Sequence, residues 1–227
     1  MTDIFHEIEE DLRRDRFRRL WDRFGLHVII LVVLVIAGTA AFSGYRWWKI
    51  RQEQAAGARF ETASQLAAEG KIAEAQVAFS LLAKDGTPGY QVLARLRAAA
   101  EVARSDASKG AAAFDAIAAD TGLGTITRDI ALVRAGLLLV DSAPLAELEQ
   151  RLKRLADSTS ALRFSAREIL ALAQFRAGDL AAAHTAATLL LEDPDVPTGV
   201  RVRADLIRAL TAAAVQLNPA LAPSATQ

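Results

Sequence analysis

The feature that most constrains this chain is an apolar run of twenty residues, from Leu26 to Tyr45, which contains no Lys, Arg, Asp or Glu. As a helix this run is about 30 Å long, which matches the hydrocarbon core of a bilayer. A helix satisfies its own backbone hydrogen bonds, so it can cross lipid without help from another segment. The sequence therefore predicts a single transmembrane helix over residues 25–46.

A cleaved secretory signal is the alternative interpretation of this run. Such a signal has a short basic leader, an apolar stretch of about 7–15 residues and a small-residue cleavage site. The small residues from Ala37 to Ala41 are compatible with cleavage. The long segment before the run, residues 1–24, and the length of the run itself favour an uncleaved anchor.

Basic residues flank the run unequally. Arg46, Lys49 and Arg51 follow it, and twice as many arginines precede it. Because the side richer in Lys and Arg usually stays in the cytoplasm, we expect a cytoplasmic N-terminus and an exported C-terminal domain. The preceding arginines are Arg13, Arg14, Arg16, Arg18, Arg19 and Arg23. The aromatic residues expected at the two membrane interfaces are Trp21, Phe24, Tyr45, Trp47 and Trp48.

Residues 1–24 form a charged cytoplasmic arm in this interpretation, and residues 47–55 connect the span to the next domain. The arginines of the arm set the topology and hold the inner leaflet. Alternatively, Ile4, Phe5 and Ile8, together with the nearby acids, dock a cytoplasmic partner.

Beyond residue 55 the sequence is rich in Ala and Leu, and its helix-breaking turns recur at a constant interval. Turns centred on Gly70, Asp106, Ser142 and Gly178 lie 36 residues apart. A fixed period in this range, with two helices per unit, is typical of an α-solenoid. An ordinary helical bundle with evenly spaced turns is the alternative. The expected helices cover 55–69, 73–84, 89–104, 108–119, 126–140, 144–156, 161–177, 179–192 and 198–216.

The first and last of these units resemble the tetratricopeptide repeat. Small residues stand where paired helices approach closely, and glycine stands at the turn: Ala63, Gly70 and Ala75 in the first unit, and Ala171, Gly178 and Ala183 in the last. The fold class is therefore all-α, with one N-terminal transmembrane helix and a tetratricopeptide repeat-like solenoid over 56–217. About four helical hairpins precede a capping helix, whose apolar stripe of Val202, Leu206, Leu210, Ala213 and Leu217 makes it one-sided. Residues 218–227 are expected to be a disordered tail.

The composition excludes several kinds of chemistry. The chain has no cysteine, which excludes disulfides, zinc thiolates and thiol nucleophiles. Its basic and acidic residues balance at 27 each, which argues against nucleic acid as a partner. His6, His27 and His184 lie too far apart in the predicted fold to form a metal site, and His184 is expected to face solvent. We predict no catalytic residue, no metal, no cofactor and no enzymatic activity.

A binding groove is the more plausible kind of site. In a tetratricopeptide solenoid the first helix of each unit lines the concave face, and here those positions are mostly apolar. An apolar groove suits an amphipathic helix or an unfolded stretch of a client protein. The alternative is that these side chains pack on one another or under helix 198–216. The candidate groove residues are Phe60, Leu96, Leu132, Leu139, Leu172 and Phe175, with Ser64, Ala100 and Glu168 between them.

The layout as a whole resembles the YfgM-like family of ancillary subunits of the bacterial SecYEG translocon. The likeness rests on the charged arm, in its alphaproteobacterial form, on the run Gly44–Tyr45–Arg46–Trp47–Trp48 after the span, and on the units at Gly70 and Gly178. The resemblance implies an inner-membrane protein with a periplasmic repeat domain that associates with the translocon and with periplasmic chaperones or exported chains. A structural envelope or division component that self-associates through its repeats is the alternative function, and a homo-oligomer is compatible with both.

Overall fold

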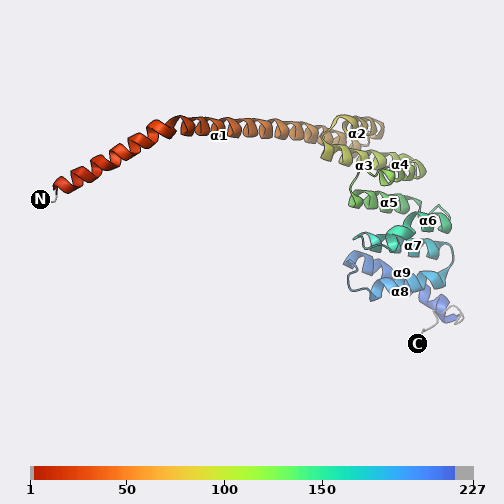
Figure 1. Cartoon of the computed structure of the whole chain (residues 1–227). Helices are drawn as coiled ribbons and strands as arrows, with labels where there is room; N and C mark the ends of the chain where they lie inside the picture. The colour runs from red at the N-terminus through yellow and green to blue at the C-terminus, as the bar shows by residue number, and fades with distance from the viewer. Residues whose placement is uncertain (1–2, 218–227) are drawn as a thin grey trace. The chain divides into compact units, whose positions relative to one another are not determined.

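The computed structural model is helical throughout the part of the chain that it describes, which is the backbone of residues 3–217 and the side chains of residues 21–213 except Val28. Figure 1 shows the order of the helices. They are α1 (Asp3–Ala68), α2 (Ile72–Asp85), α3 (Pro88–Ser105), α4 (Ala107–Ala119), α5 (Thr125–Leu139), α6 (Leu145–Ala156), α7 (Arg163–Arg176), α8 (Leu180–Glu192) and α9 (Thr198–Leu217). The predicted all-α class is confirmed.

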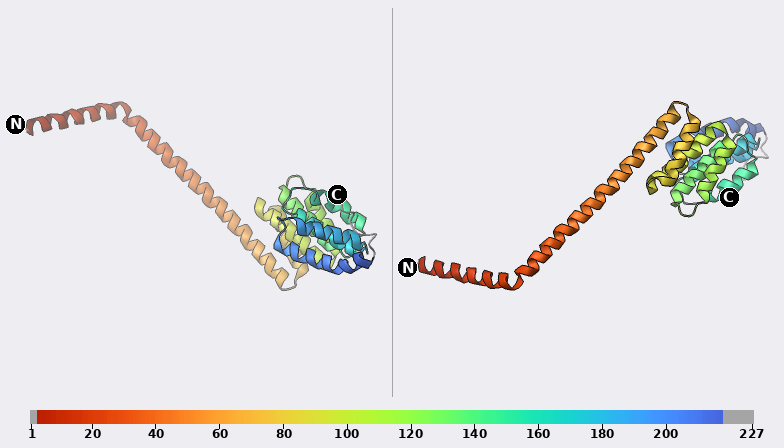
Figure 2. Two further views of the ribbon diagram at one scale, coloured as in Figure 1. Left: turned by 90° about the horizontal axis from the view of Figure 1, so that it is seen from below. Right: turned by 90° about the horizontal axis from the view of Figure 1, so that it is seen from above.

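The chain divides into two units, Met1–Ala55 and Ala56–Gln227. The first unit is helical from Asp3 onward and includes the apolar run. The second unit holds the end of α1 and the helices α2–α9. In both views of Figure 2 the helices of the second unit lie side by side, and each helix from α2 to α8 contacts the next one along the chain. The expected tail at 218–227 lies outside the described residues.

The helices of the second unit agree with the predicted ranges to within two residues. One difference is that the predicted helix 55–69 is the last part of the longer helix α1. Another is at Pro144, which precedes α6 as its N-cap instead of lying inside its first turn. The α-helical hairpins therefore pair α1 with α2, α3 with α4, α5 with α6, and α7 with α8.

The 36-residue period is also present in the core. One small residue in the first helix of each hairpin is almost fully buried, and these residues repeat at that interval: Ala63, Ala99, Ala135 and Ala171. A methyl group here lets the second helix approach closely, whereas a larger side chain would hold the pair apart. Between α3 and α4 the approach is so close that a Cβ on Gly110 would overlap Ala103.

The turns of the first and last hairpins are built differently from the middle ones. Gly70 and Gly178 have φ of +79° and +82°, a region that side chains disfavour. In each turn the next N–H reaches back to close a Schellman motif, from Lys71 to the Leu66 carbonyl at 2.9 Å and from Asp179 to Gln174 at 3.0 Å. The turn before α4 instead uses the Asp106 carboxylate, which accepts a hydrogen bond from the Lys109 N–H.

Side chains also connect each hairpin to the next at the ends of the second helices. A residue in the first or second turn of α3, α5, α7 and α9 donates a hydrogen bond to a carbonyl in the last turn of the helix before it. Such carbonyls have no partner within their own helix. The pairs are Gln91 to Lys84 at 2.9 Å, Arg128 to Ala118 at 2.9 Å, Arg167 to Ala156 at 2.8 Å, and Arg201 to Leu191 at 2.8 Å. We call these four bonds the inter-hairpin caps.

Candidate interaction surfaces

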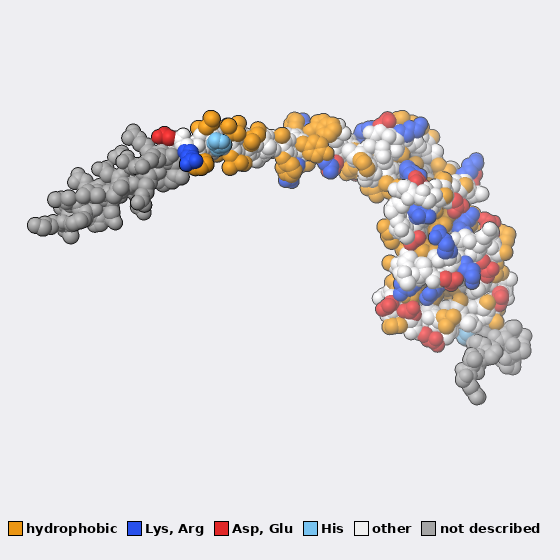
Figure 3. Space-filling view, in the orientation of Figure 1, with side chains coloured by type: hydrophobic (Ala, Val, Ile, Leu, Met, Phe, Trp, Pro, Cys, Tyr) orange, Lys and Arg blue, Asp and Glu red, His pale blue; other side chains and the backbone are white. Residues whose placement is uncertain are grey.

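The apolar run of α1 is exposed along its whole length within its own unit. Every described side chain from Leu26 to Tyr45 is exposed, and hydrophobic side chains cover this part of α1 in Figure 3. By length and composition this is the one helix of the described residues that could cross a membrane, and a signal sequence near the N-terminus would meet the same criterion.

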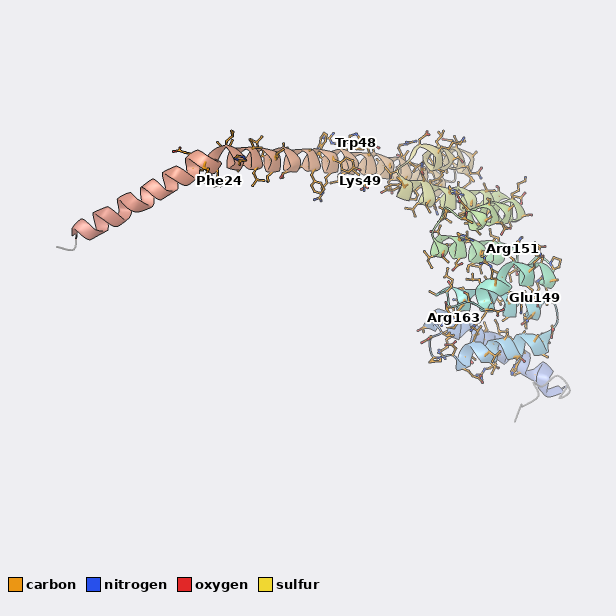
Figure 4. The ribbon with its side chains drawn as sticks, viewed as in Figure 1. Phe24, Trp48, Lys49, Glu149, Arg151 and Arg163 are labelled. Carbon is orange, nitrogen blue, oxygen red and sulfur yellow. The ribbon has the colours of Figure 1, made fainter. Side chains whose placement is uncertain are left out.

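Aromatic and arginine side chains lie together at both ends of this run. Before it, the Arg23 guanidinium lies 5.9 Å from the centre of the Phe24 ring. After it, Arg51 lies 4.5 Å from the centre of Trp47, at a cation–π distance. Figure 4 labels Phe24 and Trp48 near the two ends. The other predicted interface aromatics, Trp21 and Tyr45, are exposed as well.

Of the six arginines expected to set the topology, only Arg23 has a described side chain. The side chains of the others lie outside the described residues, as does the alternative docking stripe at Ile4, Phe5 and Ile8. The undescribed arginine side chains are Arg13, Arg14, Arg16, Arg18 and Arg19.

The candidate groove residues fall into separate packing clusters. Phe60 contacts Phe79, with ring centres 5.3 Å apart, in the cluster between α1, α2 and α3. Leu96 and Leu132 pack against a central cluster, and Leu139 belongs to it, only 8% exposed. The burial of Leu139 agrees with the alternative that these side chains pack on one another, because α5 turns this side chain into the core.

At the far end of the solenoid, Leu172 and Phe175 pack against a cluster that includes Ile207 of α9. Both side chains are half-buried. Glu168 is buried on the same helix and accepts hydrogen bonds from Arg203 of α9. These groove residues therefore contribute to packing under α9. Leu172 and Phe175 stay partly open to solvent, and we call this partly exposed pair the rim.

The face that α9 buries differs from the predicted one. Val200, Ala204, Ile207 and Thr211 are buried. The stripe that was expected to make α9 one-sided points to solvent: Val202, Leu206 and Leu210 are 65%, 59% and 58% exposed, and Ala213 is exposed too. Both sets have helical spacing, so the sequence pattern alone did not distinguish them.

The buried carboxylates of the second unit each have a partner. Glu101 pairs with Arg97 at 3.2 Å and with Arg104 at 3.1 Å, and it lies on α3. Asp129 on α5 accepts a hydrogen bond of 2.6 Å from the Ser160 hydroxyl. They lie on different helices, and no group of three metal-ligating side chains occurs among the described residues. The partners of Glu101 lie on its own helix, whereas the bond to Asp129 joins α5 to the turn after α6.

His184 also takes part in packing, which corrects the expectation that it faces solvent. Its Nδ1 lies 3.0 Å from the hydroxyl oxygen of Thr211, a fully buried residue on α9. The imidazole therefore joins α8 to α9 and is only half exposed.

A shallow cavity of about 420 Å³ lies between the start of α5 and the turn after α6. Thr125, Ile126, Asp129 and Arg154 line it together with residues 158–161. Its one buried carboxylate, Asp129, already accepts a hydrogen bond from the Ser160 hydroxyl. Elsewhere on α6, Arg151 pairs with Asp115 at 3.0 Å, and Figure 4 labels Arg151 and Glu149.

Comparison with known proteins identifies the repeat architecture. Residues 18–167, more than half of the chain, match the family model described as a tetratricopeptide repeat-like domain. No curated protein and no solved structure matches the chain. Repeats of this kind are scaffolds for protein–protein interaction, and the match indicates no catalytic family. The chain belongs to the tetratricopeptide repeat-like family.

Proposed function

We propose that this protein is a non-enzymatic scaffold that is tethered to the bacterial inner membrane by one transmembrane helix. The observation that carries the proposal is the run from Leu26 to Tyr45, in which every described side chain is exposed. Soluble proteins rarely expose an apolar patch this large, whereas the hydrocarbon core of a bilayer would cover it. Aromatic and arginine side chains at both ends of the run fit the two interfaces of a bilayer.

In the proposed arrangement residues 1–24 are cytoplasmic, residues 25–46 span the membrane, and residues 47–55 connect to a periplasmic repeat domain over 56–217. The arginines before the span support this orientation. Reporters active in only one compartment, fused after Gln227 or before Met1, test the orientation. Periplasmic activity at Gln227 is expected, and cytoplasmic activity there would refute the arrangement.

Carbonate extraction separates an anchor from a cleaved signal. An anchored chain stays in the membrane pellet at its full mass, because only detergent releases a spanning helix. A shorter product in the supernatant would show cleavage within the small residues from Ala37 to Ala41.

We further propose that the scaffold is an accessory to the protein-export translocon, in the manner of the YfgM-like family that it resembles. A tether confines the repeat domain near the channel exit and raises its effective concentration for emerging chains or for periplasmic chaperones. The half-buried rim at Leu172 and Phe175 is the proposed contact surface for these partners.

Photocrosslinking from position 175 in living cells, followed by purification in mild detergent, tests this role. Translocon subunits, chaperones or exported chains are expected in the adducts. A probe at Lys153, an exposed residue of α6, is the control and should give none of them. Adducts made only of this chain would favour the alternative of a self-associating envelope component.

A further inference from the structure

The solenoid carries an exposed apolar stripe along α9, formed by Val202, Leu206, Ala209, Leu210 and Ala213. Solenoids usually end in a helix whose outer face is polar, since an apolar end invites association. Here the outer face is the apolar one, and more than half of each of its three large side chains is open to solvent.

Comparison with α7 shows what kind of surface this is. Residues that stand 36 positions before Val202 and Leu206 are Ala166 and Leu170, and both pack against α6 or the central cluster. The opposite side of α7, with Phe164 and Ala171, packs toward α8 and α9. Thus α7 is covered on two sides, whereas α9 has the second apolar side without a described helix against it.

The spacing of the stripe is self-complementary. Its large residues stand four apart, with Leu206 in the middle. If two copies of α9 cross antiparallel at Leu206, Val202 of one copy lies opposite the partner's Leu210, and the reverse contact follows by symmetry. The small side chains at Ala209 and Ala213 allow the two helices to approach closely.

Charges beside the stripe favour the same arrangement. Asp205 and Arg208 lie on one flank, both exposed, and within one copy they pair at 2.7 Å. An antiparallel pair brings this flank of one copy against the same flank of the other. In the register centred on Leu206, Asp205 then lies within one residue of the position opposite the partner's Arg208, and Arg208 lies equally near the partner's Asp205.

We propose that α9 is the contact surface of a homodimer, in which two copies pack antiparallel through Val202, Leu206 and Leu210. A single helix pair is smaller than the interfaces of stable complexes, about 1,200–2,000 Å² in total, so the contact is weak in dilute solution. Where both copies are held in one membrane, as the proposed tether requires, their effective concentration is higher and the dimer forms more readily. The contact does not depend on a translocon partner.

The absence of cysteine from the chain makes a crosslinking test direct. The full-length protein in lipid nanodiscs or mild detergent is oxidised after the substitution Leu206→Cys, and a covalent dimer is expected because this position faces itself. A mixture of Val202→Cys and Leu210→Cys proteins should give more dimer than either alone. Val77→Cys, on an equally exposed apolar position of α2, is the control and should stay monomeric. Equal crosslinking at positions 77 and 206, or none at 206, would overturn the proposal.

Charge reversal provides an independent test that leaves the core untouched. Asp205→Arg and Arg208→Asp each place like charges across the proposed contact, so each protein alone should lose at least tenfold in dimer affinity by sedimentation. When the two variants are mixed, opposite charges face each other again and a heterodimer should form. Unchanged dimerisation in the single variants, or no recovery on mixing, would refute the antiparallel register. Unaltered thermal unfolding by circular dichroism shows that each variant is folded.

Discussion

Arg203 on α9 donates two hydrogen bonds to the carboxylate of Glu168 on α7, which is only 6% exposed. The second of these, from Nη2 to Oε2, measures 2.8 Å. The hydrogen bond from the guanidinium to Glu168 is the main cause that raises the pKa of Arg203 above its ordinary value. This bidentate pair holds the last helix to the hairpin before it.

Arg203→Ala should destabilise the repeat domain by about 1–3 kcal/mol, because the buried Glu168 carboxylate loses its partner. This loss of stability is smaller than the loss expected when a fully buried ion pair is broken, since the Arg203 side chain is 57% exposed. Urea unfolding of the full chain, followed by circular dichroism, measures the change. Lys153→Ala removes an exposed ion pair with Asp157 and should change stability by less than about 1 kcal/mol. Equal losses of stability from the two substitutions would contradict a stabilising role for the Arg203–Glu168 pair.

The inter-hairpin caps should contribute measurably to stability. Arg167→Ala leaves the Ala156 carbonyl without its side-chain donor, and we expect a loss of about 1–2 kcal/mol in the free energy of unfolding. Arg167→Lys retains the charge but not the planar donor, so it should recover only part of the loss. If alanine and lysine are both neutral in chemical denaturation, these bonds do not stabilise the stack.

Gly178 should tolerate alanine poorly although there is space for the added methyl group. Its φ of +82° disfavours any side chain, and the expected destabilisation is about 1–2 kcal/mol. Gly89, in the first turn of α3, has equal space and an ordinary φ, so Gly89→Ala should be neutral or slightly stabilising. Thermal unfolding of both variants makes the comparison. A loss at position 89 as large as that at position 178 would show that the positive φ is not the cause of the destabilisation.

Asp120 should make the fold sensitive to acid. Hydrogen bonds from Arg95, at 2.7 Å, and from the Gly122 N–H hold the pKa of Asp120 below its ordinary value of 3.8. A carboxylate with a lowered folded-state pKa adds stability above its ordinary pKa, and this stability disappears as the pH falls through the folded value. The difference in unfolding free energy between wild type and Asp120→Asn should therefore be constant from pH 7 to about pH 5 and shrink below that. A difference that does not depend on pH down to acid unfolding would exclude this role for the carboxylate.

The sequence predicted the helices and their pairing because several local signals agreed. Gly70 and Gly178 mark the turns, Pro88 opens α3, and the buried alanines repeat with the same period as the turns. Agreement between turn chemistry and helical spacing left few alternatives to a stack of hairpins.

The sequence did not predict which side of α9 would be buried. Both the stripe of Val200, Ala204 and Ile207 and the stripe of Val202 and Leu206 have helical spacing, and the larger leucines pointed to the wrong one. The rotation of α9 is set by tertiary contacts, namely the bonds of Arg201 to the end of α8 and of Arg203 to Glu168. For the same reason the arginines of the inter-hairpin caps could not be distinguished from surface arginines, although their place early in alternate helices is a usable signal.

The inter-hairpin caps connect only adjacent members of the stack, so cohesion in this domain passes from neighbour to neighbour. Unfolding can then begin at one end and stop part of the way along the stack, instead of involving all hairpins in one cooperative transition. A weakened link at Arg128 should yield a partly melted intermediate, whereas a uniformly cooperative globule would yield none. Stepwise unfolding of this kind would change the surface offered to a bound protein one hairpin at a time, so that the protein could fold on it or be released from it in steps.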